Sequence, residues 1–434
     1  MTLHAYFTFD RAGQGLFYHG EILCGDQSFS VVYDCGTSNQ IKGAKENLSE
    51  VVDQYHREQQ KQTIGLLAIS HFDFDHVSHI PELLQKCKVD TVMLPHISKE
   101  LRVVFWAKCA FDAYGSDYES GFIEQQEQDR DLIELFRNPV GYFREKGAKQ
   151  IIGVSGDNDG NVPSNEEPIF PFEPKESEYE DSDRSHLRYV GGGQQVPQKD
   201  QKYVVYEGSP TYRFEAKYYS WLFRPLNIQD KLPQAFYDDV KSILRQYSSW
   251  QDLLSDFSKI KELRQLYDLY IGRGRRNSHS LLLRHEPEQH RCLMSNCCKN
   301  RRCRRYQCLE WLWTCKKFGP WDNSATVLLG DLELDGKARA ALKRYKFLCD
   351  KTGVVLIPHH GANSDDLMWL DEEIMQNDNC ASLVVSYGTK NRHKNKDGHP
   401  HPRFIYDGKI AEVESTVFFS NEKIEYRYSV YLCD

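Results

Sequence analysis

The sequence predicts an α/β protein, because short apolar segments alternate with polar, helix-forming segments toward both ends of the chain. Near the N-terminus, apolar runs at 64–69 and 89–95 are typical of buried strands, and a helix-forming segment begins between them at Ile80. Near the C-terminus, strand-like runs lie at 277–283, 325–331, 354–361 and 382–386. Strands separated by helices favour a sheet with parallel neighbours, whose strand ends often carry functional residues.

The first strands and the first helix are expected before these runs. Residues 6–9 and 29–33 are rich in aromatic and β-branched residues, which favour strands. The second of these strands ends at Asp34-Cys35-Gly36, where we expect a turn. The polar segment 45–59 that follows is expected to form a helix.

The middle of the chain differs in composition and is expected to be an insertion. Residues 156–202 are rich in Glu, Asp, Ser, Pro and Gly, so they bury too little apolar surface to order themselves, and we expect a mobile segment. Phe236, Val240 and Ile243 follow a helical spacing, which predicts that 203–270 is mostly helical. The expected organisation is one half of the fold at 1–155, the insertion at 156–270 and the other half at 271–434.

The most informative segment is Ser70-His71-Phe72-Asp73-Phe74-Asp75-His76, which directly follows an apolar run. Two histidines and two carboxylates crowded together repel one another unless they are neutralised, and one or two divalent cations do this naturally. A solvated acidic loop is the alternative. The bracketing histidines and the apolar flanks favour a metal site.

Other strand-like runs also end in side chains that bind metals. Asp331 follows Gly330, His359 and His360 precede Gly361, and His399 precedes Pro400. Because separate strand ends of one sheet can meet at one edge, we expect a two-metal site there. A carboxylate and a hydroxide would bridge ions that lie ~3.5–4 Å apart.

In their order along the chain, these motifs resemble the metallo-β-lactamase superfamily, with the greatest likeness to ComEC-type competence nuclease domains and phosphorylcholine esterases. The matching motifs are Gly13-Gln14-Gly15, Asp34-Cys35-Gly36, His71-x-Asp73-x-Asp75-His76, Asn277-x-x-Ser280-Leu281, Gly330-Asp331, Pro358-His359-His360-Gly361 and Gly398-His399-Pro400. They cover the two ends of the chain and leave its middle without a counterpart. The resemblance implies an αββα sandwich with metals at one edge and a helical, partly disordered insertion.

The resemblance also implies a role for each of these side chains. His71, Asp73 and one of His359 and His360 would hold one ion, Asp75 and His76 would hold the other, Asp331 would bridge the two, and His399 would be a further ligand. Asp75 and His359 are the expected catalytic residues. Asp34, Asn277 and Ser280 would support the ligands from behind.

Two departures from the family bear on the metal. Many members have a histidine where this chain has Asp73, and a carboxylate shifts the preference toward Mn²⁺ or Mg²⁺ without excluding Zn²⁺. Many also place a histidine ligand where Asn277 stands here, so one ion would be weakly held or supplied with the substrate. His279 lies nearby, but we expect it to be a packed strand residue.

Basic residues near the expected site indicate the substrate. They cluster at 273–276, at 299–305 and at 390–396. Arg276, Lys390 and Arg392 are expected to bind substrate, because such cations suit phosphates better than a neutral amide or lactone. Scattered, solvated charge is the alternative for each cluster.

A cysteine-rich segment lies at 292–315. Its cysteines are Cys292, Cys297, Cys298, Cys303, Cys308 and Cys315. They lack the paired Cys-x-x-Cys spacing of familiar zinc modules, so a structural Zn²⁺ and a loop of free thiols both stay open. The chain has 13 cysteines and shows no secretory signal, which predicts a reducing, cytoplasmic location without a membrane partner.

The expected function is metal-dependent phosphodiester hydrolysis, first of all by a nuclease acting on DNA or RNA. The formal net charge of -8 counts against general nucleic-acid affinity, but the basic clusters are local. One alternative is a hydrolase of a small phosphodiester, a cyclic nucleotide or a thioester, and another is a regulatory protein with a structural metal site. The acidic segment 156–202 would act as an autoinhibitory lid released by a protease or a regulatory protein, or would be an inert loop.

Overall fold

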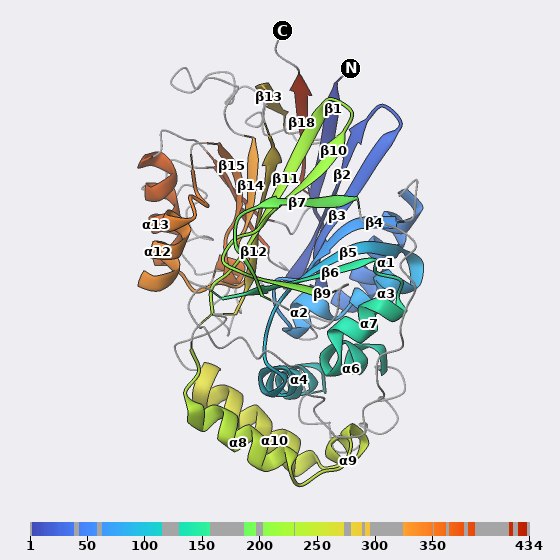
Figure 1. Ribbon diagram of the computed structural model, residues 1–434, viewed down its shortest axis with the longest axis vertical. Coiled ribbons are helices and arrows are strands. Elements are labelled where there is room, and N and C mark those ends of the chain that lie inside the picture. The colour runs from blue at the N-terminus through green and yellow to red at the C-terminus, as the bar shows by residue number, and fades with distance from the viewer. Residues whose placement is uncertain are drawn as a thin grey trace.

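The computed structural model describes most of the chain, and its strands form two sheets with helices on their outer faces (Figure 1). The described residues are 2–38, 43–58, 63–114, 130–156, 186–196, 203–229, 231–272, 279–288, 291–295, 324–349, 351–361, 364–376, 381–386, 416–419 and 424–431. The predicted mixed α/β class is therefore confirmed. Within these residues, no helix has the length and apolar character needed to cross a membrane.

The first sheet contains most of the N-terminal strands. Across the sheet, these are β13 (Arg291–Ser295), β18 (Ile424–Tyr431), β1 (Leu3–Phe9), β2 (Gly15–Cys24), β3 (Gln27–Thr37), β4 (Thr63–Ala68), β5 (Lys88–Pro95), β6 (Gln150–Ser155), β9 (Tyr203–Glu207) and β8 (Gln194–Val196). The strands from β3 to β9 run parallel to one another. Their carboxyl ends therefore lie along the same edge of the sheet.

The second sheet joins the C-terminal strands to strands from the middle of the chain. Across the sheet, these are β17 (Thr416–Phe419), β16 (Ser382–Val385), β15 (Thr352–Leu356), β14 (Ala325–Leu328), β12 (Leu281–Pro287), β11 (Tyr219–Asn227), β10 (Thr211–Ala216) and β7 (Leu187–Gly191). The strands from β14 to β17 are parallel, and the others pair antiparallel.

The two sheets pack face to face through a large apolar core. Its members include Phe7 and Tyr18 from the first sheet and Trp221 and Phe223 from the second, all fully buried. Phe7 lies 5.7 Å from Trp221 between ring centroids, so aromatic contacts join the sheets directly.

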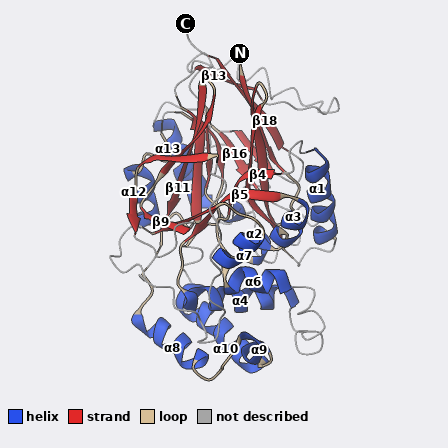
Figure 2. Cartoon of the chain, turned by 45° about the vertical axis from the view of Figure 1, so that its right-hand side comes forward, coloured by secondary structure: helices blue, strands red, loops and turns tan. Residues whose placement is uncertain are grey.

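Helices cover the outer face of each sheet, as Figure 2 shows in blue and red. On the first sheet these are α1 (Ala44–Glu58), α3 (Ile80–Lys86), α4 (Lys99–Tyr114), α6 (Arg130–Arg137) and α7 (Pro139–Glu145), with α8 (Gln234–Leu244), α9 (Trp250–Leu254) and α10 (Phe257–Tyr267) in the same apolar cluster. On the second sheet they are α12 (Gly336–Arg344) and α13 (Ser364–Gln376). α1 shows why such helices form, since its buried Leu48, Val52 and Tyr55 share one face of the helix.

The prediction of a mostly helical middle segment is wrong for residues 203–227. This part forms β9, β10 and β11, which belong to both sheets, and helices begin only at Gln234. In β11, buried Tyr219, Trp221 and Phe223 alternate with less buried side chains, which is the period of a strand. Within the predicted mobile segment, residues 186–196 are described and form β7 and β8, while 157–185 and 197–202 lie outside the described residues.

Candidate metal centre

The metal-type side chains of the first sheet follow the end of β4. Ser70 and His71 come directly after this strand, and the short helix α2 (Phe74–Val77) carries Asp75 and His76. The chain turns after β4. In a straight strand, alternate side chains would point to opposite faces of the sheet, so the turn allows these side chains to lie on the same side. Backbone bonds from His76 and Val77 to the carbonyl oxygen of Asp73 close this turn.

The side chains of the second sheet follow the ends of β14 and β15. Asp331 lies after β14, and its backbone N–H donates to Ser280 Oγ over 3.3 Å. His359 and His360 lie in a 3₁₀ turn after β15, both with positive φ values of 51° and 50°. Such backbone conformations are unfavourable for residues with a side chain and gather at functional sites.

Asp34 lies in a bulge of β3, where its side chain contacts Ser70 and His76. The pairing of β2 with β3 passes from Phe17–Cys35 to Tyr18–Tyr33, so Asp34 has no opposite residue, and its φ is 56°. The expected turn at this position is thus a bulge inside a strand, which re-aims one side chain. The Asp34 carboxylate is fully buried and accepts hydrogen bonds of 2.6 Å from both the backbone N–H and the hydroxyl of Ser70.

Gly36 allows the α2 turn to lie directly against β3. A Cβ atom added at Gly36 would lie 2.6 Å from the backbone carbon of Asp75 and from the backbone nitrogen of His76. A backbone atom cannot rotate away as a side chain can. The glycine therefore positions the two ligand-type side chains of α2.

We predict that Gly36→Ala destabilises the protein by about 1–3 kcal/mol and weakens metal binding, because the α2 turn has to move. Gly336→Ala is the matched control, since an added Cβ there meets nothing within 4 Å. Urea unfolding and metal titration of the two variants measure the difference. Equal stability and metal affinity in Gly36→Ala and the wild type would contradict this role.

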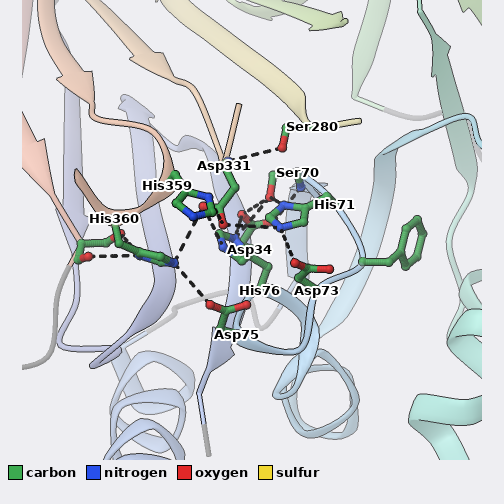
Figure 3. A network of polar contacts seen from close by, with 12 residues as sticks. Asp34, Ser70, His71, Asp73, Asp75, His76, Ser280, Asp331, His359 and His360 are labelled. Atoms are coloured by element: carbon green, nitrogen blue, oxygen red, sulfur yellow. Dashed lines mark hydrogen bonds and ion pairs between the residues drawn. The ribbon is translucent and has the colours of Figure 1, made fainter. Parts of the chain in front are cut away.

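The side chains from these separate elements meet in one buried cluster (Figure 3). Asp331 lies at its centre: its carboxylate is 3.2 Å from His76 Nε2 and 3.8 Å from both His71 Nε2 and His360 Nε2. His359 Nδ1 lies 3.6 Å from the same carboxylate. The structure therefore brings together side chains from three separate strand ends, those of β4, β14 and β15.

Hydrogen bonds to Nδ1 fix the orientation of three of these histidines. Nδ1 of His71 lies 2.8 Å from Ser70 Oγ, and Nδ1 of His76 lies 2.8 Å from Asp34 Oδ2. Nδ1 of His360 lies 3.1 Å from the carbonyl oxygen of Ser386. A neutral histidine that donates through Nδ1 has its lone pair on Nε2, which is the arrangement found in metal ligands.

The Nε2 atoms of His71 and His76 are buried and make no hydrogen bond to any described residue. Buried polar atoms are normally satisfied, so these two nitrogens call for another partner. They lie 3.8 Å and 3.2 Å from oxygens of the Asp331 carboxylate, separations that two ligands of one ion can have. This donor set of imidazole nitrogens and carboxylate oxygens fits Zn²⁺ or Mn²⁺.

Charges inside the cluster shift the pKa values of its members. Burial opposes the charged form of His76, but the carboxylates of Asp331 and Asp34 outweigh it and hold the pKa of His76 well above its ordinary value. Burial likewise opposes ionisation of Asp331, yet the neighbouring His76 and His360 hold its pKa well below the usual range. The pKa of His360 is raised, chiefly by Asp331 acting against burial.

We predict that metal binding at neutral pH releases protons, because the carboxylates of Asp331 and Asp34 favour the protonated form of His76 and a ligand must be neutral. Lowering the pH below neutrality should therefore weaken metal affinity. Calorimetry in two buffers of different ionisation enthalpy measures the release directly. Binding enthalpies that agree between the buffers would contradict the prediction.

Two sets of side chains could each hold an ion. The ligand atoms of His71, His76 and Asp331 lie within 4.8 Å of one another, and so do those of Asp75, His76 and His360. This differs from the expected sharing. His360 groups with Asp75 and His76, and His76 belongs to both sets, whereas Asp331, the expected bridge, belongs only to the first. Asp73 belongs to neither set, and its Oδ2 lies 2.8 Å from Nζ of Lys108 in α4.

The cluster opens to solvent at Asp75 and His359. Each of these side chains is 21% exposed, whereas those of His71, His76, Asp331 and His360 are 6% exposed or less. The two residues predicted to be catalytic therefore have the most exposed side chains among the described members of the cluster.

Several predicted site residues lie outside the described part of the chain. They are Arg276, Asn277, Cys297, Cys298, Cys303, Cys308, Cys315, Lys390, Arg392 and His399. Cys292 lies in β13, where its backbone pairs with Val430, and the structure describes nothing further of its side chain. His279 is buried with Phe105, 6.2 Å away between ring centroids, as expected of a packed residue.

Sequence reasoning missed Lys108 and Ser386. Ser386 is the last residue of the strand-like run 382–386 and directly follows β16, so its place at a strand end is an available signal. Lys108 lies in the middle of α4, where nothing in the local sequence marks it.

No protein-family model matches this chain, and a search of curated proteins finds none that is similar to it. The resemblance to the metallo-β-lactamase superfamily therefore stays a prediction from the sequence motifs.

Proposed function

We propose that the chain is a metal-dependent phosphodiester hydrolase with the αββα sandwich of the metallo-β-lactamase superfamily, and that it is a nuclease. Two face-to-face sheets with helices on both outer faces support this fold. The observation that carries the proposal is the convergence of His71, His76 and His360 around Asp331, at the ends of strands from both sheets. A purely structural site is normally closed, whereas this cluster is open at one side.

The position of each residue in the cluster indicates its proposed role in hydrolysis. Bound divalent cations would act as Lewis acids toward a phosphoryl oxygen and lower the pKa of a water molecule. Asp331 and the buried histidines would hold these ions. Asp75 would also orient the attacking water by accepting a hydrogen bond, and His359 would donate a proton to the leaving oxygen.

The substrate class rests on charge. Basic residues adjoin two of the motifs in the sequence: Arg276 directly precedes Asn277, and Lys390 and Arg392 precede His399. Such cations would favour a phosphate over a neutral amide. Neutralising Lys390 and Arg392 together should weaken nucleic-acid binding and reduce the slope of log affinity against log salt by about 1–2. An unchanged slope would show that these residues belong to the general surface.

Incubation of the full chain with Mn²⁺ or Zn²⁺ tests the function. We expect cleavage of plasmid DNA or RNA, inhibition by a chelator and loss of cleavage in Asp331→Ala purified alongside, which controls for contaminating nuclease. Cleavage of bis-p-nitrophenyl phosphate alone would favour a small-molecule phosphodiesterase. A metal-loaded protein that cleaves none of these would favour a regulatory protein.

A further inference from the structure

Asp73 is paired with a lysine inside the metal cluster. Lys108 Nζ lies 2.8 Å from Asp73 Oδ2, whereas His71 Nε2 lies 3.6 Å from the same oxygen. Both members are largely buried, with the lysine side chain 15% exposed and the aspartate side chain 6% exposed. This is an ion pair of the interior, where charges interact more strongly than on the surface.

The fold holds Lys108 in this position. The residue lies on α4, and its ammonium is 5.4 Å from the centre of the Tyr267 ring of α10. The next residue, Cys109, donates from Sγ to the carbonyl oxygen of Phe72 over 3.0 Å, which ties the same turn of the helix to the loop that carries Asp73. The contacts of its ammonium with Asp73 and the Tyr267 ring, together with the bond from Cys109 to the loop, hold Lys108 in place at the site.

A fixed ammonium changes what the site can bind. The oxygen of Asp73 that faces His71 is the one bonded to Lys108, so a cation beside His71 would compete with the ammonium for this oxygen and be repelled by it. Asp73, the partner of Lys108, does not belong to the set of Asp75, His76 and His360. The ammonium of Lys108 therefore lies on the His71 side of the cluster.

We propose that Lys108 acts as a built-in cation at the His71 side of the site, so that the two ion positions are unequal. One ion binds tightly to Asp75, His76, His360 and Asp331. The second binds weakly beside His71 and is retained when an anionic substrate offsets the repulsion. This inference rests on the proposed function and deepens it, because it makes the phosphate of the substrate part of metal binding.

Metal titration of the full chain tests the role of Lys108. After desalting, the wild type should retain one Mn²⁺ per chain by elemental analysis, with a second seen only as weak binding in calorimetry. Lys108→Met, similar in length but uncharged, should bind the second ion at least about tenfold more tightly. Lys108→Arg keeps the charge and should behave as the wild type. Two equally tight ions in the wild type, or an unchanged second constant in Lys108→Met, would overturn the proposal.

Asp73→Asn keeps the inference testable if Lys108→Met fails to fold. The variant should retain the one tight ion, because Asp73 is the partner of Lys108 and not a ligand of that ion; loss of the tight ion would overturn the inference. A folded wild-type protein that binds no divalent ion would contradict the proposed function itself. Two equally tight ions would contradict only the role of Lys108.

Discussion

Asp331→Ala is expected to abolish hydrolysis, with a fall toward the uncatalysed rate of about 10⁶-fold or more. The Asp331 carboxylate lies 3.2 to 3.8 Å from the Nε2 atoms of His71, His76 and His360, so its removal would take away the ligand that we propose for both ion positions. Bound metal should be lost together with activity. Elemental analysis and a phosphodiesterase assay on the same sample measure both.

Asp331→Asn is the matched variant that separates the loss of the charge from the loss of side-chain volume. It keeps the shape of the side chain and the hydrogen bond from its backbone to Ser280, so the fold should persist, but the charge that holds the cations is gone. Wild-type metal content or turnover in either variant would contradict the bridging role.

Asp75→Ala has the second largest expected effect, a loss of activity to near background in a protein that still folds. The side chain is partly exposed and lies in a short turn rather than in the apolar core, while its oxygen is 3.3 Å from His360 Nε2. It would both hold an ion and orient the attacking water. Circular dichroism together with kinetics at saturating Mn²⁺ separates folding from catalysis.

Asp26→Ala is the control for Asp75→Ala, because this exposed aspartate precedes the opposite end of β3. It should retain full activity. Turnover that persists in metal-replete Asp75→Ala would remove Asp75 from the mechanism.

The central residues of the candidate site can be predicted from the sequence, because short local patterns mark each of them. The apolar run before His71 predicts a strand, and the clustered ligand types after it predict a metal edge. The same reasoning applies to Asp331 and His360, since each follows its own apolar run. Parallel strands bring such ends together, so local patterns were enough to group residues far apart in the chain.

The pairing of Asp73 with Lys108 could not be predicted in this way. It depends on how α4 packs across the loop after β4, and an isolated lysine in a helix usually faces solvent. The strands at 203–227 were missed for another reason. In β11, the alternation around Trp221 has the period of a strand, whereas the helical spacing around Phe236 applies only from Gln234 onward.

Crystals of the full chain grown with Mn²⁺ or Zn²⁺, with anomalous data collected at the absorption edge of the metal, would show directly whether the cluster binds metal. We expect a strong anomalous peak bound by Asp75, His76, His360 and Asp331, with a weaker peak beside His71. A metal-saturated crystal with no peak within ligand distance of Asp331, or with its peaks elsewhere in the molecule, would contradict this expectation.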